Sequence, residues 1–314
     1  MKNFKTIFLM SLFLFLIILI SYHWIFPENG KYEYEDENGD LIAWVGPFQP
    51  CIIYVKTNSE TFESTTPVFG VDRRHADLAF RISVALWTNI WLAFIAATVF
   101  VILAIISGIL IGYDQSHLPP IKHRNTFDNI KRLRKVKLGK LFTQLLVETL
   151  HAIPMLLLLL VVVIISFRLF DDNIIRMLVM MIAIGVLSIP KLALLIRDRI
   201  EALVDEEFIN AAKASGLSDT KIIFTHILWY ECSPIIAGQF IYVIVQAIML
   251  EAVISFLGFG GGTSLGGLIY QFKDSLPGPG NSGSPLALMP LFILLLVAIV
   301  GNGCAKLFME LRHE

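Results

Sequence analysis

Long apolar runs separated by short polar stretches dominate the chain. An α-helix needs roughly 20 consecutive apolar residues to cross the hydrocarbon core of a bilayer, and several runs reach that length. The pattern therefore predicts an all-α integral membrane protein with six transmembrane helices. They are expected within 1–26 and at about 84–112, 142–168, 175–197, 233–257 and 286–308. This spacing divides the chain into an N-terminal anchor, an insert at 27–80 and a five-span core at 81–314.

The first apolar run resembles a signal peptide only superficially. It follows Lys2 and Lys5, but its apolar stretch is nearer twenty residues than ten. It ends in Trp24, Phe26 and Pro27, without the small residues that mark a cleavage site. We interpret it as an uncleaved first span.

A concentration of positive charge sets the expected orientation. The segment 113–140 carries eight lysines and arginines, and such clusters remain on the cytoplasmic side of the membrane. Alternation of the spans then places both termini and the loop at 198–232 in the cytoplasm. It places 27–80 outside, where ten acidic residues face four basic ones.

The external insert has two open interpretations. The stretch "CIIYVKTN" is typical of a strand, and "ENGKYEYEDENGDL" contains turn-forming Asn-Gly pairs. These features predict a small, partly ordered element. A solvated loop without regular structure is the alternative.

Composition excludes some functional classes. Hydrophobic residues make up 56% of the chain and charged residues 16%, and the mean hydropathy is +0.71. The net charge of −1 argues against a nucleic-acid partner, which needs a concentrated basic surface. Three widely spaced cysteines indicate neither a disulfide framework nor a metal site.

One loop between spans contains more structure than a turn requires. In "FINAAKASGLSDTKIIFTHIL", residues 208–228, the alanines favour a helix and Gly216 is suited to end it in a left-handed conformation. Ser218 or Asp219 can cap a second helix, in which Ile222, Ile223 and Ile227 form an apolar stripe. The pattern predicts a rigid helical hairpin at the membrane surface, although ordinary helix formation alone also explains these residues.

The loop closely resembles the EAA loop of permease subunits from bacterial ATP-binding-cassette importers. The family pattern is "EAA, three residues, G" followed by "I-L-P". The matching positions here are Asn210, Ala211, Ala212, Gly216, Ile227 and Leu228. The resemblance implies that the segment contains the coupling helix, which docks on the ATPase subunit. It assigns Leu217, Ser218 and Asp219 to the same contact.

Two further stretches resemble the dipeptide, oligopeptide and nickel permeases. "LEAVISFLGFG" at 250–260, followed by Ser264-Leu265-Gly266, is similar to the end of their fifth span. "GVDRRHADLAFR" at 70–81 retains Asp72, Asp77 and Arg81 of the pattern "TDxxGRDxxSR". The order of spans and insert is similar to the C-type permease of such systems. Asn210 and Trp229 replace the glutamate and proline of the loop motif, and His75, Ala76 and Phe80 depart from the upstream pattern, so the chain is identified as a divergent member.

The resemblance implies a set of partners in the bacterial inner membrane. They are a second, B-type permease, two ATP-binding-cassette ATPases, an extracytoplasmic solute-binding protein and the lipid bilayer. The chain lacks the GxxxxGK[ST] phosphate loop, so ATP and Mg²⁺ are expected to be used by the ATPases. No cofactor is expected on this chain. The solute is a peptide or a related small molecule, with nickel or another solute as the alternative.

Few polar residues within the spans suggest chemistry. Glu251, with Ser255 four residues later, is the candidate for a translocation path, because charges retained in a span tend to face protein or water. A hydrogen-bonded structural carboxylate is the alternative. Glu148 and His151 have the spacing of a bundle metal site but no second copy, so no metal is expected. An intramembrane enzyme or a non-transporting scaffold remains as a distant alternative.

Overall fold

The computed structural model describes eleven ranges of the chain. They are residues 2–26, 33–35, 51–54, 62–65, 68–72, 76–112, 140–203, 206–218, 221–260, 263–275 and 284–310. The basic segment at 113–139, the two Asn-Gly turns of the insert and Asp219 lie outside them.

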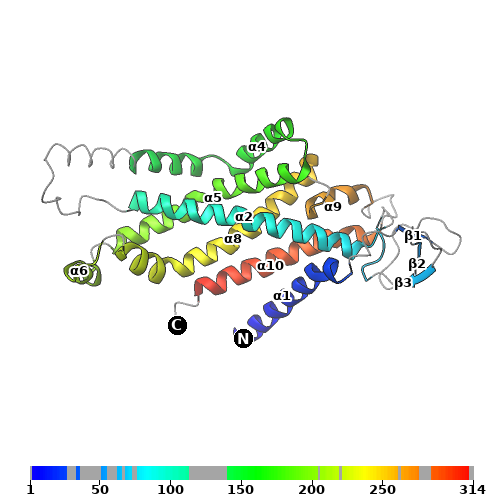
Figure 1. Ribbon diagram of the computed structural model, residues 1–314, viewed down its shortest axis with the longest axis horizontal. Coiled ribbons are helices and arrows are strands. Elements are labelled where there is room, and N and C mark those ends of the chain that lie inside the picture. The colour runs from blue at the N-terminus through cyan, green and yellow to red at the C-terminus, as the bar shows by residue number, and fades with distance from the viewer. Residues whose placement is uncertain are drawn as a thin grey trace. The chain divides into compact units, whose positions relative to one another are not determined.

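Helices form nearly all of the described structure (Figure 1). Four stretches are long and apolar enough to cross a membrane: α2 (Leu78–Gly112), α5 (Asn173–Leu203), the continuous helix Ile222–Phe259 and the helix Pro285–Glu310 that contains α10 (Met289–Glu310). The N-terminal helix α1 (Lys2–Ile25) has an apolar part at Leu9–Ile25 that is shorter than these four. The described helices therefore support a multi-pass membrane protein with four such spans.

The span expected at 142–168 is broken. A helix at Lys140–Ala152 and α4 (Met155–Leu169) meet at an angle of 94° around Ile153 and Pro154. Proline has no backbone N–H to continue the helical ladder, and its ring disfavours a helical residue before it. The sequence predicts that Pro154 bends or relieves its helix, and the chain does bend there. The pair forms either one broken span, which would make five, or a re-entrant segment.

A small antiparallel sheet corrects the all-α expectation. Its strands are β1 (Glu33–Glu35), β2 (Cys51–Tyr54) and β3 (Phe62–Thr65), in the order β1-β2-β3. Tyr54 pairs with Glu33 on one side and with Phe62 on the other. The strand predicted from "CIIYVKTN" is thus confirmed as the central strand of the insert.

The predicted hairpin differs from the structure at its second helix. The short helix α6 (Glu207–Ala214) stands alone, but the segment after it continues into the next span without a break. This helix begins as a π-helix (η3, Ile222–Cys232), proceeds as α8 (Ser233–Ile254) and ends as a second π-helical turn (η4, Ser255–Phe259). The apolar stripe and the span are therefore one element. Beyond it lie α9 (Leu265–Phe272), η5 (Lys273–Ser275) and η6 (Pro285–Leu288).

The chain divides into two compact units. Unit 1 comprises 1–94, 163–181 and 245–303, and unit 2 comprises 95–162, 182–244 and 304–314. Helices α2, α4, α5, α8 and α10 each contribute residues to both units.

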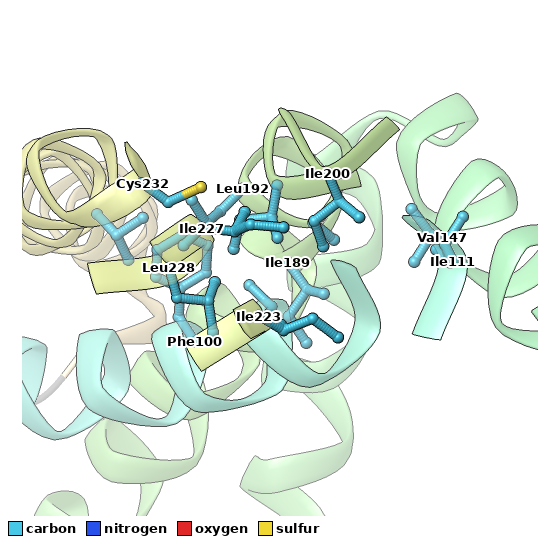
Figure 2. Close-up of a cluster of buried hydrophobic side chains, with 14 of the residues drawn as sticks. Phe100, Ile111, Val147, Ile189, Leu192, Ile200, Ile223, Ile227, Leu228 and Cys232 are labelled. Carbon is cyan, nitrogen blue, oxygen red and sulfur yellow. The ribbon is translucent and has the colours of Figure 1, made fainter. Parts of the chain in front are cut away.

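Unit 2 is built around one apolar cluster (Figure 2). Phe100 of α2, Leu192 of α5 and Ile227 of η3 are almost fully buried within it. Gly108 permits a close approach of α2 to α5, because an added Cβ would lie 2.7 Å from Cβ of Ile196 and 2.9 Å from the carbonyl oxygen of Ala193. This is the packing role that small residues have in membrane helices.

We expect Gly108→Val to lower the melting temperature of the purified chain in detergent micelles. The added side chain must push α5 away, and overpacking of this kind costs about 1–3 kcal/mol. Ile106→Val is the matched control, because it places the same side chain on the same helix at a position that is 50% exposed. Equal melting temperatures for the two variants would contradict the close contact.

Candidate functional site

Helix α6 lies on the core of unit 2 through one face only. Ile209 is 1% exposed and belongs to the apolar cluster, and Ala212 and Leu217 pack against it. On the other face, Phe208 is 44% exposed, and Ala211 and Ser215 are also exposed. Sequence reasoning did not single out Phe208. The missed signal is a large exposed aromatic residue on a short helix whose opposite face is buried.

The end of α6 has the geometry that the sequence predicts. Gly216 has φ of +80°, and the backbone N–H of Leu217 donates to the carbonyl oxygen of Ala212 at 3.2 Å. This bond and the left-handed glycine together form a Schellman C-cap. No atom of the described residues lies within 4 Å of a Cβ added at Gly216, so the described part of the chain leaves this turn uncovered.

The next helix is capped and anchored in the same unit. Ser218 Oγ accepts from the backbone N–H of Lys221 at 3.4 Å, and its carbonyl oxygen accepts from the N–H of Ile222 at 3.0 Å. The predicted capping by Ser218 is confirmed, although the hydroxyl bond is long. Ile222, Ile223, Ile227 and Leu228 are buried, as expected for the apolar stripe. The side chain of Asn210 is outside the described structure.

The structure brings Asp72, Asp77 and Arg81 together in unit 1. Asp77 caps α2, because its Oδ1 accepts from the backbone N–H groups of Ala79 at 2.8 Å and Phe80 at 3.2 Å. Its Oδ2 accepts from the hydroxyl of Tyr22 on α1 at 3.0 Å. Asp77 thus fixes the start of α2 and connects α1 to it.

Arg81 joins the loop before α2 to helix α9. Its guanidinium forms an ion pair with Asp72, whose side chain is fully buried. It also donates to Gln271 Oε1 at 2.6 Å and lies 5.6 Å from the ring centroid of Phe272. Asp72, Asp77 and Arg81 therefore have a structural role in this conformation, in which the charges of Asp72 and Arg81 are paired inside the protein.

Glu251 is fully buried in unit 1 and hydrogen-bonded to several elements. Its Oε2 accepts from Asn89 Nδ2 of α2 at 3.0 Å, and its Oε1 accepts from the hydroxyl of Ser255. The hydroxyl of Ser264 and the backbone N–H of Gly266, at the start of α9, also donate to it. Such a set of donors is what a carboxylate needs when it is removed from water.

This arrangement favours the structural alternative for Glu251 in the observed conformation. The carboxylate faces protein donors, and both the residue and Ser255 are buried. Ser264 also caps α9, since its Oγ accepts from the N–H of Gly267 at 2.9 Å. The two ends of α9 are therefore held by two separate polar clusters, one at Glu251 and one at Arg81.

We expect Arg81→Leu to destabilise the purified chain, because Asp72 would remain buried without its counter-charge. Loss of one partner of a buried pair costs about 3–5 kcal/mol. The double variant Asp72→Leu/Arg81→Leu should recover part of this loss, as measured by thermal unfolding in detergent. If the double variant is as unstable as the sum of the two single variants, the side chains are not coupled.

A model of a known family matches most of the second half of the chain. The family is described as "Binding-protein-dependent transport system inner membrane component", and its model matches residues 131–310. The matched range contains α6, the π-helix, Glu251 and α9.

Curated proteins with similar sequences are named as permeases. A dipeptide transport system permease protein of Alkalihalophilus pseudofirmus is 41% identical over 80 residues, covering 26% of each chain. An oligopeptide transport system permease protein of Lactococcus lactis subsp. lactis is 32% identical over 117 residues, covering 36% of this chain and 40% of that one. A dipeptide transport system permease protein of Lactococcus lactis subsp. cremoris is 26% identical over 71% of this chain and 58% of its own length. The first two alignments thus span less than half of the relatives they match.

Proposed function

We propose a role for this chain from the premise that it belongs to the family of inner membrane components of binding-protein-dependent transport systems. The chain is the permease subunit of an ATP-driven importer of peptides or related small solutes. Its five-span core at 81–314 and the N-terminal anchor together make six spans, with the broken pair around Pro154 counted as one. Both termini and the loop at 198–232 lie in the cytoplasm.

One observation carries this proposal: one face of α6 packs on the apolar cluster of unit 2, and the opposite face is exposed. Ile209 fixes the helix to the apolar cluster, while Phe208, Ala211 and Ser215 are presented outward. When a partner moves a short helix that is packed in this way, the helices of the same unit that contact it move as well. The small side chains allow a close approach, and Phe208 offers apolar area that a partner can bury.

The partner that fits this surface is an ATP-binding-cassette ATPase. Asn210, Ala211, Ala212, Gly216, Leu217, Ser218 and Asp219 form the contact segment, and Ile227 anchors its second half. Two ATPases, a B-type permease and an extracytoplasmic solute-binding protein complete the assembly in the bacterial inner membrane. The ATPases bind ATP and Mg²⁺, and each partner favours one of two states of the permease.

The transported solute follows from the relatives. Those reported above are named as dipeptide and oligopeptide permeases, which supports a peptide over nickel. Glu251 and Ser255 contribute to the path by holding α9 in place. In this proposal they become accessible only when the conformation changes. Asp72, Asp77 and Arg81 support the same helix from its other end.

We expect Gly216→Val to abolish ATP-dependent uptake of a peptide by cells or proteoliposomes that hold the full transporter. Valine adopts a φ of +80° only with strain, so the turn after α6 must change. Gly216→Asn is the matched variant, because asparagine tolerates this conformation better, and it should retain more uptake. Membrane insertion is checked for both by fractionation. Full uptake by the valine variant would count against coupling through this turn.

We further expect the chain to copurify with an ATPase subunit from its native membrane. Phe208→Ser should weaken this association, because it removes exposed apolar area. Phe292→Ser is the matched control, since Phe292 is 56% exposed on α10 and outside the loop. Copurification that is unchanged by Phe208→Ser would contradict docking on this face.

A further inference from the structure

A small cavity in unit 1 holds a cationic group that the proposed function does not yet use. The cavity has a volume of about 10 Å³ and is lined by residues of α4, of the start of α5 and of the end of η4. Arg176 of α5 is one of its lining residues. Phe167 and Phe259, which also line it, are 37% and 38% exposed, so the cavity opens at the surface of this unit.

The guanidinium of Arg176 is held firmly on one side. One of its terminal nitrogens donates to the carbonyl oxygen of Asp171 at 2.7 Å and to Oδ1 of Asn173 at 2.8 Å. The group lies 4.4 Å from the ring centroid of Phe167, which itself packs edge-on against Phe259. Hydrogen bonds and ring contact therefore fix the plane of the guanidinium.

The other side of the group is not satisfied. Among the described residues, the buried Nε of Arg176 has no hydrogen-bond acceptor. Within the described residues, Arg176 forms no ion pair, and its hydrogen-bond acceptors are uncharged oxygens. The carboxylate of Asp172 accepts instead from the backbone N–H of Ile174 at 2.7 Å. A buried N–H donor on a permanent cation is costly unless an acceptor reaches it.

The cavity that the Arg176 side chain lines has room for one oxygen atom. A cavity of about 10 Å³ accommodates a single water-sized group. A carboxylate oxygen has this size, carries the charge that complements the guanidinium and accepts hydrogen bonds only. The rest of such a ligand would lie outside, along the exposed rings of Phe167 and Phe259.

We propose that the Arg176 cavity binds a carboxylate of the transported solute at the outer end of the permease, with one carboxylate oxygen seated in the cavity beside the guanidinium. This inference rests on the proposed function and its orientation, in which α5 begins and the Ile222–Phe259 helix ends on the extracytoplasmic side. A solute released by the external binding protein meets this end of the spans first. A free peptide carries a carboxylate at its C-terminus, so the cavity selects for an unmodified C-terminus.

The test compares trialanine with trialanine amide, which lacks the carboxylate charge. Uptake of each is measured in proteoliposomes that hold the full transporter and its binding protein. Wild type should prefer the acid, and Arg176→Gln should reduce the ratio of acid to amide uptake by about tenfold, the value expected for one charged hydrogen bond. The binding protein's own preference cancels, because the same protein serves every variant.

Arg168→Gln is the matched control, because Arg168 is exposed near the end of α4 and does not line the cavity. It should leave the acid-to-amide ratio at the wild-type value. An unchanged ratio in Arg176→Gln would overturn the proposal, as would an equal change in both variants. If the wild-type transporter takes up neither peptide in an ATP-dependent manner, this result would instead contradict the proposed function.

A binding measurement keeps the site testable if Arg176→Gln transports nothing. Ile174, which is exposed beside the lining residue Asn173, is replaced by Cys in a chain whose Cys51, Cys232 and Cys304 are changed to Ser. Trialanine should slow maleimide labelling of this cysteine, trialanine amide should not, and Arg176→Gln should remove the protection. Equal protection by both peptides, or none by either, would overturn carboxylate binding. In a further outcome, Arg176→Gln no longer copurifies with the binding protein, yet trialanine still protects the cysteine. Arg176 would then contact a carboxylate of the binding protein, and this result would also count against solute binding.

Discussion

Apolar contact between the segment at 207–232 and the helices of unit 2 is the interaction on which the functional interpretation depends. Ile209 and Ile227 are each 1% exposed and share one cluster with Phe100 and Leu192. Within a lipid environment, packing of this kind and satisfied backbone bonds replace most of what the hydrophobic effect supplies in water. The cluster joins α6 to the spans, so the proposed transmission of force from α6 would pass through these buried apolar contacts.

Unit 1 follows a different physical rule, in which buried polar groups find partners on other elements. Glu251 connects the Ile222–Phe259 helix with α2 and α9, and Arg81 connects α2 with Asp72 and with α9. Each group would be costly to bury alone. Together they hold a short helix in place. Among the described residues, Nε of Arg176 is buried without an acceptor, and Oδ1 of Asn89 is buried without a donor.

Much of this structure could be predicted from the sequence, and the failures have physical reasons. Hydropathy located α2, α5 and α10 because long apolar runs have few alternatives in a membrane. Gly216 and Ser218 were placed correctly because caps depend on local chemistry. The two prolines predict bent or relieved helices but not which helix ends: Pro190 is accommodated inside α5, whereas the helix breaks at Pro154. Tertiary contacts decide between these outcomes.

Long-range partners escaped prediction for the same reason. Asn89 and Glu251 are 162 positions apart, and Arg81 and Gln271 are 190 apart. No local pattern connects such pairs. From the sequence, Glu251 is either a residue of the translocation path or a structural carboxylate. Only the hydrogen-bond donors around it favour the second interpretation for this conformation. Phe208 was overlooked because an aromatic residue at a helix start is common, whereas its exposure is visible only in three dimensions.

The π-helical start of the helix Ile222–Phe259 has a consequence for changes in chain length. Residues Ile222–Cys232 are held by hydrogen bonds that enclose one more residue than those of an α-helix. A deletion of one residue in this stretch can be absorbed by a return to α-helical bonding, without moving α8 along its axis. This stretch is therefore expected to tolerate the loss of one residue better than the regular α-helical turns of α8.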